Sequence, residues 1–390
     1  MLLLNPAFLY AATWLFVTTL YAAGLSDMLE PLKGATLALV IGSSAGFILG
    51  WAAESVTRGG RFASVKRNLS LIVERLQSRR LARRVRWAFV LFVAGVTVEI
   101  VYFGGAPFLS IVGIGPDIPY TEFGISGLHG VLNAIFYACC TVQFARLITA
   151  PQASASEKWL LAFASIVYPV LMMSRQVFIS LLVQYLIIYL SFRRLSLGRA
   201  VRVAVLFIGA FLLFGYLGDI RSGRESIVAL AQPTFDYPEW LPSAFIWFYI
   251  YLCTPLNNVN FNIDIAPHYF PFETIGTLIP SFARESFLGL LGDRRQWELV
   301  SESFNVSSLL QSFVTDFGVV GTSVVTFLIG LVFARLLRNS PKHPFSFFAT
   351  VVFVHGIALS FFANLLFHLV FLFEILVSGW MLRKPHRPAG

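Results

Sequence analysis

The stretch SRRLARRVRWAFVLFVAGVTVEIVYF, residues 78–103, joins a strongly basic segment to an apolar run of membrane-spanning length. The basic segment reaches back over residues 54–86, where ten Lys and Arg residues stand against two acids. Short loops rich in Lys and Arg beside membrane ends remain in the cytoplasm. The stretch therefore predicts an integral membrane protein and places residues 54–86 on the cytoplasmic side.

The same basic segment carries apolar side chains at helical spacing. They are Val65, Leu69, Ile72, Val73 and Leu76. This pattern predicts an amphipathic helix that lies on the inner membrane surface and is held there by anionic lipids. Topology and anchoring explain the segment; a regulatory partner site is the alternative.

The composition of the whole chain agrees with a membrane protein. Of its 390 residues 57% are hydrophobic and 13% are charged, whereas soluble domains carry about 25% charged residues. The net charge of +9 lies mostly in short loops between apolar runs, so it indicates topology and excludes nucleic acid as a partner. Cys139, Cys140 and Cys253 form no CxxC pair and predict no disulfide framework. The N-terminus lacks a basic n-region and a cleavage site, so we expect it to begin the first span.

The hydropathy pattern predicts one all-α polytopic membrane domain, residues 1–390, with about ten transmembrane helices and both termini in the cytoplasm. The expected spans are residues 6–24, 35–53, 87–103, 126–148, 159–173, 177–192, 203–217, 308–337, 345–362 and 365–382. Every inner connection between these spans is basic. We see no internal repeat and expect no soluble domain.

A long periplasmic segment, residues 218–305, separates spans 7 and 8 and is acid-rich, unlike the inner loops. Within it Phe245–Pro255 is too short to cross the membrane, and it predicts an interfacial or re-entrant helix that faces protein or a cavity. Aromatic faces suit sugar rings and amides suit sugar hydroxyls, although an aromatic belt at the membrane interface gives the same pattern. The residues concerned are Tyr237, Trp240, Trp247, Tyr249, Tyr251, Phe261 and Tyr269 with Asn257, Asn258, Asn260 and Asn262.

Four arginines could bind an anion. Arg175 lies midway through about 35 mostly apolar residues, where a buried guanidinium costs about 2.5–3.5 kcal/mol, so it must face water, an anion or an acid, or else snorkel to headgroups. Arg221 and Arg224 point to one side if their stretch is helical, and together they can then hold a diphosphate. An ion network of this pair with neighbouring acids is the alternative. Arg284 is a weaker candidate on its own.

Four side chains could accept a proton in general acid–base chemistry. The candidates are Asp219, Glu225, Asp316 and His129, and the sequence does not choose among them. Asp316 can instead complement a helix dipole, and His129 can be a hydrogen-bonded structural histidine with Tyr120 and Glu122 near it.

Other ionisable groups within the spans have structural expectations. Glu99 should point inward, because facing lipid is costly. His355, His368 and Glu374 are expected to be structural. No HxxxH, CxxC, DxD, Walker A or dinucleotide pattern is present, so we expect no metal and no cofactor.

The order of short motifs between residues 100 and 330 resembles the oligosaccharide repeat-unit polymerases, the O-antigen polymerase (Wzy-type) family. The motifs are GGAPF (104–108), YTEFGISGLHG (120–130), SRQ (174–176), GDIRSGRE (218–225), YIYLCTPLNN (249–258) and TDFGVVG (315–321). The first two spans match that family in character alone.

The resemblance implies a metal-independent glycosyltransferase with a glycosyltransferase-C-like helical fold at the periplasmic face of a bacterial inner membrane. It would polymerise undecaprenyl-diphosphate-linked repeat units into O-antigen or a similar surface polysaccharide, and a chain-length regulator protein is a further expected partner. The family's functional arginines carry over to Arg175, Arg221, Arg224 and, more weakly, Arg284. The implied glycan contacts are Tyr120, Tyr249, Tyr251, Asn257 and Asn258.

Three other functions stay open. The O-antigen ligases share the architecture, but here the outer-loop histidine His268 lacks a recognisable motif. A transporter of an anionic lipid or solute should place charges deep within several spans and often shows inverted repeats. A scaffold for a glycan-assembly machine would explain the spans and leave the arginines without a role.

Overall fold

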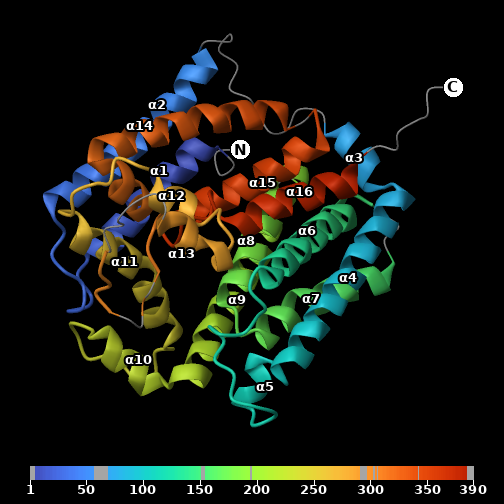
Figure 1. Cartoon of the computed structure of the whole chain (residues 1–390), viewed down its shortest axis with the longest axis horizontal. Coiled ribbons are helices and arrows are strands. Elements are labelled where there is room, and N and C mark those ends of the chain that lie inside the picture. Colours follow the sequence, from blue (N-terminus) through green and yellow to red (C-terminus); the bar gives the residue numbers. More distant parts are fainter. Residues whose placement is uncertain are drawn as a thin grey trace.

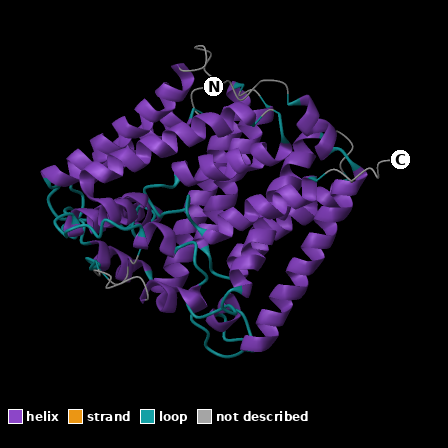
Figure 2. Ribbon diagram, turned by 45° about the horizontal axis from the view of Figure 1, so that its top comes forward, coloured by secondary structure: helices purple, strands orange, loops and turns teal. Residues whose placement is uncertain are grey.

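Helices dominate the computed structural model of this chain, and Figure 2 shows them packed side by side with loops at the periphery. Within the described residues β pairing is limited to one bridge between Ser26 and Pro233. The structure describes residues 5–56, 69–150, 154–193, 196–289, 297–301, 304, 306–340 and 342–383.

A helix occupies each segment predicted as a span. These helices are α1 (Pro6–Ala22), α2 (Gly34–Val56), α4 (Arg79–Phe103), α6 (Leu128–Thr149), α7 (Ala155–Leu171), α8 (Arg175–Phe192), α9 (Leu197–Ser222), α14 (Leu309–Asn339), α15 (Pro344–Ala358) and α16 (Leu369–Leu382). Among the described residues α2, α4, α6, α8 and α14 are long and apolar enough to cross a membrane. The chain is therefore a helical membrane protein.

Within the described residues six further helices connect these elements. Five of them are short, and α11 is as long as a span. They are α3 (Ser70–Leu76), α5 (Pro107–Ile111), α10 (Arg224–Ala231), α11 (Ala244–Asn262), α12 (Phe272–Gly276) and α13 (Ser281–Gly289). In Figure 1 the start of α4 and the end of α16 lie together beside α3, whereas α5 lies at the far end of α4. The helix expected at Phe245–Pro255 thus runs past Pro255, and α11 is buried over most of its length.

The start of α4 differs from the prediction, because the helix begins at Arg79 and includes basic residues assigned to the loop. Ser78 caps it through a hydroxyl that accepts a hydrogen bond from the Leu81 amide at 3.3 Å. Arginine is also a good helix former. Arg84 then donates to the carbonyls of Trp380 and Met381 at 3.0 and 2.8 Å, which ties α4 to the last turn of α16.

Part of the segment predicted as an amphipathic helix forms α3. Ile72 and Leu76, two of the apolar residues of that pattern, are completely buried against α6 and α15. Val65 lies outside the described residues. Apolar side chains of the protein itself therefore cover this side of α3.

The closest helix pair is α2 with α14, and glycines make the approach possible. A Cβ atom on Gly46 or Gly50 would overlap the backbone carbonyl of α14, and one on Gly330 would overlap α2. Small residues four apart let membrane helices pack backbone to backbone. The spacing Gly42, Gly46, Gly50 was visible in the sequence and was not used in the prediction.

Ion pairs join α2 and α14 at the end of this helix pair that carries the basic residues. Glu54 on α2 is buried and accepts from Arg335 at 3.2 Å and from Arg338, both in the last turns of α14. The two arginines neutralise the buried acid, which would be costly to keep away from water without such partners.

Candidate functional site

Arg175 is the centre of the most distinctive polar arrangement in the described residues. It begins α8 directly after a tight turn in which Met173 has a positive φ of 50° and Ser174 caps the helix. Its guanidinium carbon lies 4.4 Å from the centre of the Trp247 ring and 5.7 Å from that of Tyr251. Its Nη1 also donates to the Tyr251 hydroxyl at 3.4 Å. The cation therefore lies against two neighbouring aromatic rings of α11, whose centres are 5.6 Å apart.

Trp247 links this cation to an acid on a third helix. Its indole N–H donates to Asp219 Oδ1 at 3.3 Å, and the hydroxyl of Ser243 donates to the other oxygen of the same carboxylate. One face of the indole thus meets Arg175 while its edge meets Asp219. Asp219 therefore positions Trp247 through these hydrogen bonds.

Gly218 lets α9 approach this cluster. A Cβ atom there would lie 2.5 Å from the Trp247 indole nitrogen and 3.1 Å from Nη2 of Arg175. Any side chain at residue 218 would therefore displace the ring or the guanidinium. Close packing therefore requires glycine at the first position of the GDIRSGRE motif, and the sequence alone did not show this.

An apolar crevice opens beside Arg175 between α7, α8 and α9. Its walls include Pro169, Val170, Phe178 and Leu213, and Arg175 lies at its polar side. The crevice is small, with a volume of about 20 Å³, and holds little more than one water molecule.

Arg221 and Arg224 do not share a helix face, because the helix that would align them is broken. Gly223, with φ 77° and ψ 145°, ends α9 and begins α10. Arg224 turns back onto the following loop, where its Nη2 donates to the Pro238 carbonyl at 3.0 Å and its guanidinium carbon lies 5.8 Å from the Tyr237 ring centre. The side chain of Arg221 lies outside the described residues. The predicted pairing through one continuous helix is therefore wrong.

Asp316 caps a helix other than its own. It is fully buried near the start of α14, and its two oxygens accept from the amides of Glu273 and Thr274 at 2.9 and 2.7 Å. These amides open α12, so the carboxylate caps that helix. Gly318, with φ 69°, then kinks α14 just beyond it. We therefore give Asp316 a structural role.

The asparagines of α11 bind the chain's own loops. Asn257 accepts from the Tyr21 hydroxyl at 2.6 Å and from the Glu30 amide at 3.0 Å. Asn258 bonds in the same way to backbone groups within residues 300–306. Both side chains are buried and their amide groups are used internally. We therefore leave them out of the proposed site.

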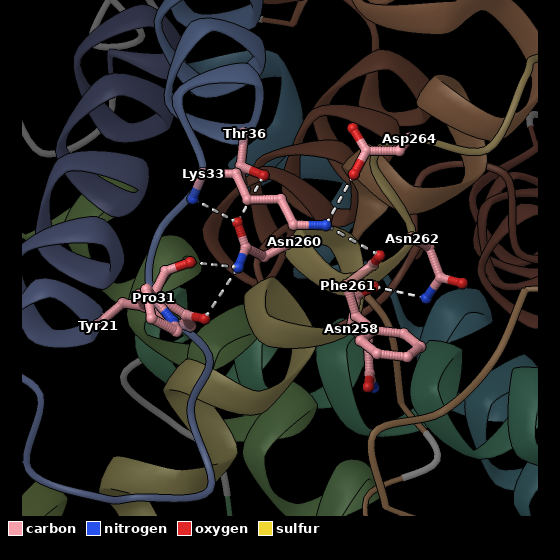
Figure 3. A network of polar contacts seen from close by, with 9 residues as sticks. All are labelled: Tyr21, Pro31, Lys33, Thr36, Asn258, Asn260, Phe261, Asn262 and Asp264. Atoms are coloured by element: carbon pink, nitrogen blue, oxygen red, sulfur yellow. Dashed lines mark hydrogen bonds and ion pairs between the residues drawn. The ribbon is translucent and has the colours of Figure 1, made fainter.

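Figure 3 shows the continuation of this network around Asn260. Its oxygen accepts from the Lys33 amide and the Thr36 hydroxyl, both at 2.8 Å, and its NH₂ group donates to the Pro31 carbonyl at 3.0 Å. Asn257, Asn258 and Asn260 of α11 thus each bind a loop. The asparagine side chains that suggested sugar binding instead hold the loops around α11 in place.

The remaining predicted glycan contacts separate into inner and outer residues. The Tyr249 hydroxyl accepts from the Leu25 amide at 3.0 Å and its ring is buried, so it is part of the core. Tyr251 contacts Arg175 and stacks at 6.1 Å on Phe362 from the loop before α16. Tyr120 is exposed, and so is Glu225 in the first turn of α10. Only Tyr251 of these tyrosines joins the arginine cluster.

His129 forms a carboxylate–histidine pair with Glu99. The His129 Nδ1 atom lies 2.9 Å from Glu99 Oε2, and the other Glu99 oxygen accepts from the Ile125 amide at 3.0 Å. Glu99 is fully buried, which confirms that it points inward, while His129 is partly exposed. A buried carboxylate that orients a histidine ring is a common way to prepare a proton acceptor.

Arg284 lies near His368, which directly precedes α16. Arg284 donates to the Ile279 carbonyl at 3.3 Å, and the neighbouring Phe282 packs on Gly127 at the start of α6.

Trp247 is the residue whose role sequence reasoning missed. It appeared there as one of many aromatic residues. Its spacing of four from Tyr251 on one helix was the available signal, since residues four apart share a helix face. Among the described residues no group of three or more His, Cys, Asp or Glu side chains is placed to hold a metal ion.

Comparison of the chain with protein-family models, with curated proteins and with solved structures gave no match in any of the three.

Proposed function

We propose that this chain is a polysaccharide polymerase that joins undecaprenyl-diphosphate-linked oligosaccharide repeat units at the periplasmic face of a bacterial inner membrane. The observation that carries the proposal is Arg175, whose guanidinium lies against the rings of Trp247 and Tyr251. The cation suits the diphosphate of a lipid-linked substrate. The motif order described above supports the same substrate.

In the proposed reaction a sugar hydroxyl of one lipid-linked unit attacks the anomeric carbon of the other glycan. The bond from that carbon to the lipid diphosphate breaks, and negative charge grows on the diphosphate. A preorganised cation in a site of reduced dielectric stabilises that charge most in the transition state. In this proposal Arg175 has that role. Arg221, near the end of α9, and Arg224, at the start of α10, are further candidates for it.

The attacking hydroxyl loses a proton, and His129 is the acceptor that we favour. Glu99 orients its ring, whereas the carboxylates of Asp219 and Asp316 are both occupied by internal donors. Glu225 is the remaining carboxylate candidate. A single displacement of this kind inverts the anomeric centre.

The proposal includes ten membrane crossings, with both termini cytoplasmic and the residues 218–305 periplasmic. The basic inner connections support this arrangement. It places Arg175, Asp219 and Arg224 at the outer membrane surface, where assembled repeat units are present.

Transport of an anionic lipid or solute is the second candidate. One observation favours it: Glu374 is fully buried within α16 and accepts from Gln184 of α8 at 3.1 Å. Ionisable groups deep between membrane helices often mark a transport path.

The test is the length of the surface glycan after deletion of the gene and complementation with variants. We expect Arg175→Ala to collapse the ladder of chain lengths to one repeat, and Arg175→Lys to restore little of it, because lysine lacks the planar guanidinium. Gln176→Ala, an exposed neighbour, should give wild-type ladders. Normal chain lengths with Arg175→Ala at normal protein level would refute the proposed role of this residue.

The same experiment separates the other functions. Loss of all lipid-A-attached glycan would indicate a ligase, and repeat units that accumulate on the cytoplasmic side would indicate a transporter. Purified protein should extend lipid-linked units in EDTA if the reaction needs no divalent metal.

A further inference from the structure

A second cavity lies at the opposite, basic end of the helices. It has a volume of about 530 Å³ and opens between α4 and α7, with α6 as its floor. Cys139 and Cys140 lie in the floor, and Phe89 and Leu160 are among the walls. The two wall helices meet farther along, where the rings of Phe92 and Tyr168 contact edge to face at 4.8 Å. The cavity is therefore a wedge that is closed at its deep end.

The mouth of this wedge is polar and carries more positive than negative charge. Arg86 and Arg146 lie there with Gln143, Ser156 and Glu157. Arg146 donates to Gln143 Oε1 at 2.8 Å and lies 3.6 Å from Glu157, so the mouth holds two guanidinium groups and one acid, which pairs with Arg146. The deep part is lined by apolar side chains and two buried thiols.

The position of the mouth matches the inner leaflet predicted from charge. It is built by the start of α4, the end of α6 and the start of α7, which are the basic ends of these helices. Helix α7 has 17 residues and so separates the mouth from the Arg175 turn by about 25 Å. The cavity and the proposed catalytic site are therefore independent.

We propose that this wedge binds one anionic glycerophospholipid. An acyl chain fills the space between α4 and α7, and the phosphate binds Arg86 and Arg146 at the mouth. Basic pockets between membrane helices on the cytoplasmic side bind anionic headgroups in this way, and guanidinium groups bind phosphate by forked hydrogen bonds. The apolar depth requires a chain, which excludes free phosphate as the full ligand.

The test is native mass spectrometry of the full chain, purified in detergent and incubated with phosphatidylglycerol or phosphatidylcholine. We expect one phosphatidylglycerol to be retained in preference to phosphatidylcholine. Arg86→Gln should reduce that retention about five-fold, the effect of one arginine near an anionic lipid surface. Arg83→Gln, an exposed arginine on the same helix outside the cavity, is the matched control and should retain the lipid.

A second variant tests the cavity without changing charge. Ala82→Phe places a ring in the wedge and should remove the bound lipid whatever its headgroup. Equal retention of the two lipids, equal losses in Arg83→Gln and Arg86→Gln, or full retention in Ala82→Phe would overturn the proposal. None of these results depends on glycan polymerisation.

Discussion

At the scale of single residues, Trp247 is the side chain on which the proposed site depends. Its ring faces Arg175 and its N–H group binds Asp219, so one residue fixes a cation from α8 and an acid from α9. A cation over an indole ring contributes about 0.5–2 kcal/mol, depending on how far it is removed from water. The orientation of Arg175 therefore depends on a residue that does not itself contact the reacting atoms in the proposed mechanism.

Replacement of Trp247 should lower polymer formation in two steps. Trp247→Phe keeps a ring beneath Arg175 but loses the hydrogen bond to Asp219, and Trp247→Leu loses both. We expect the leucine variant to reduce the rate by up to about 30-fold, the equivalent of 2 kcal/mol, and the phenylalanine variant by less. The measurement is the rate at which purified protein extends lipid-linked units.

Phe248→Leu, on the exposed side of the same helix, is the control and should keep full activity. Wild-type activity in Trp247→Leu would mean that Arg175 is held by other contacts.

At the scale of elements, two helix contacts decide the arrangement. The α2–α14 pair packs through Gly46, Gly50 and Gly330, and Glu54 closes its basic end. The other contact places α11 among α1, α9, α10 and α14, where its asparagines fasten the surrounding loops. Both contacts are made by small or polar residues within apolar helices, since lipid competes equally for apolar side chains.

A large side chain at Gly46 should separate α2 from α14. Gly46→Leu puts four carbon atoms where the α14 backbone lies, and overpacking of this kind costs typically about 1–3 kcal/mol or more. Ala45→Leu adds similar volume at the exposed neighbouring position and should be tolerated. Thermal stability in detergent compares the two variants. If Gly46→Leu unfolds at the same temperature as Ala45→Leu, the contact is not tight.

At the scale of the whole molecule, charge and structure divide the chain into two ends. Arg84 and the last turn of α16 meet at one end beside α3, and the Arg175 cluster lies at the other end of α7 and α8. In the proposed topology the first end is cytoplasmic and the second is periplasmic. The lipid wedge and the Arg175 crevice then face opposite leaflets.

Cysteine labelling of spheroplasts tests this topology. Trp240, in the segment predicted to be periplasmic, and Leu197, the first residue of α9, are both highly exposed, at 81% and 84%, and each is replaced by cysteine in turn. A membrane-impermeant maleimide should label the first in intact spheroplasts and the second only after permeabilisation. The three native cysteines are buried and should react little. Labelling of both positions from one side would reject the arrangement.

The sequence alone accounts for the membrane class and for where the apolar helices lie. Hydropathy and basic loops act locally through the free energy of each segment in lipid, so a helix lies at each of the predicted segments. Glu99 could also be placed, because a charge within a span has to point inward.

Only the tertiary structure decided which polar groups meet. Gly223 separates Arg221 from Arg224, Asp316 caps α12, and Asn257 and Asn258 bind loops. Each outcome depends on partners that are distant in the sequence or on one backbone angle. Residue type and spacing specify what a side chain can bind, whereas packing between helices selects the partner that comes within hydrogen-bonding distance.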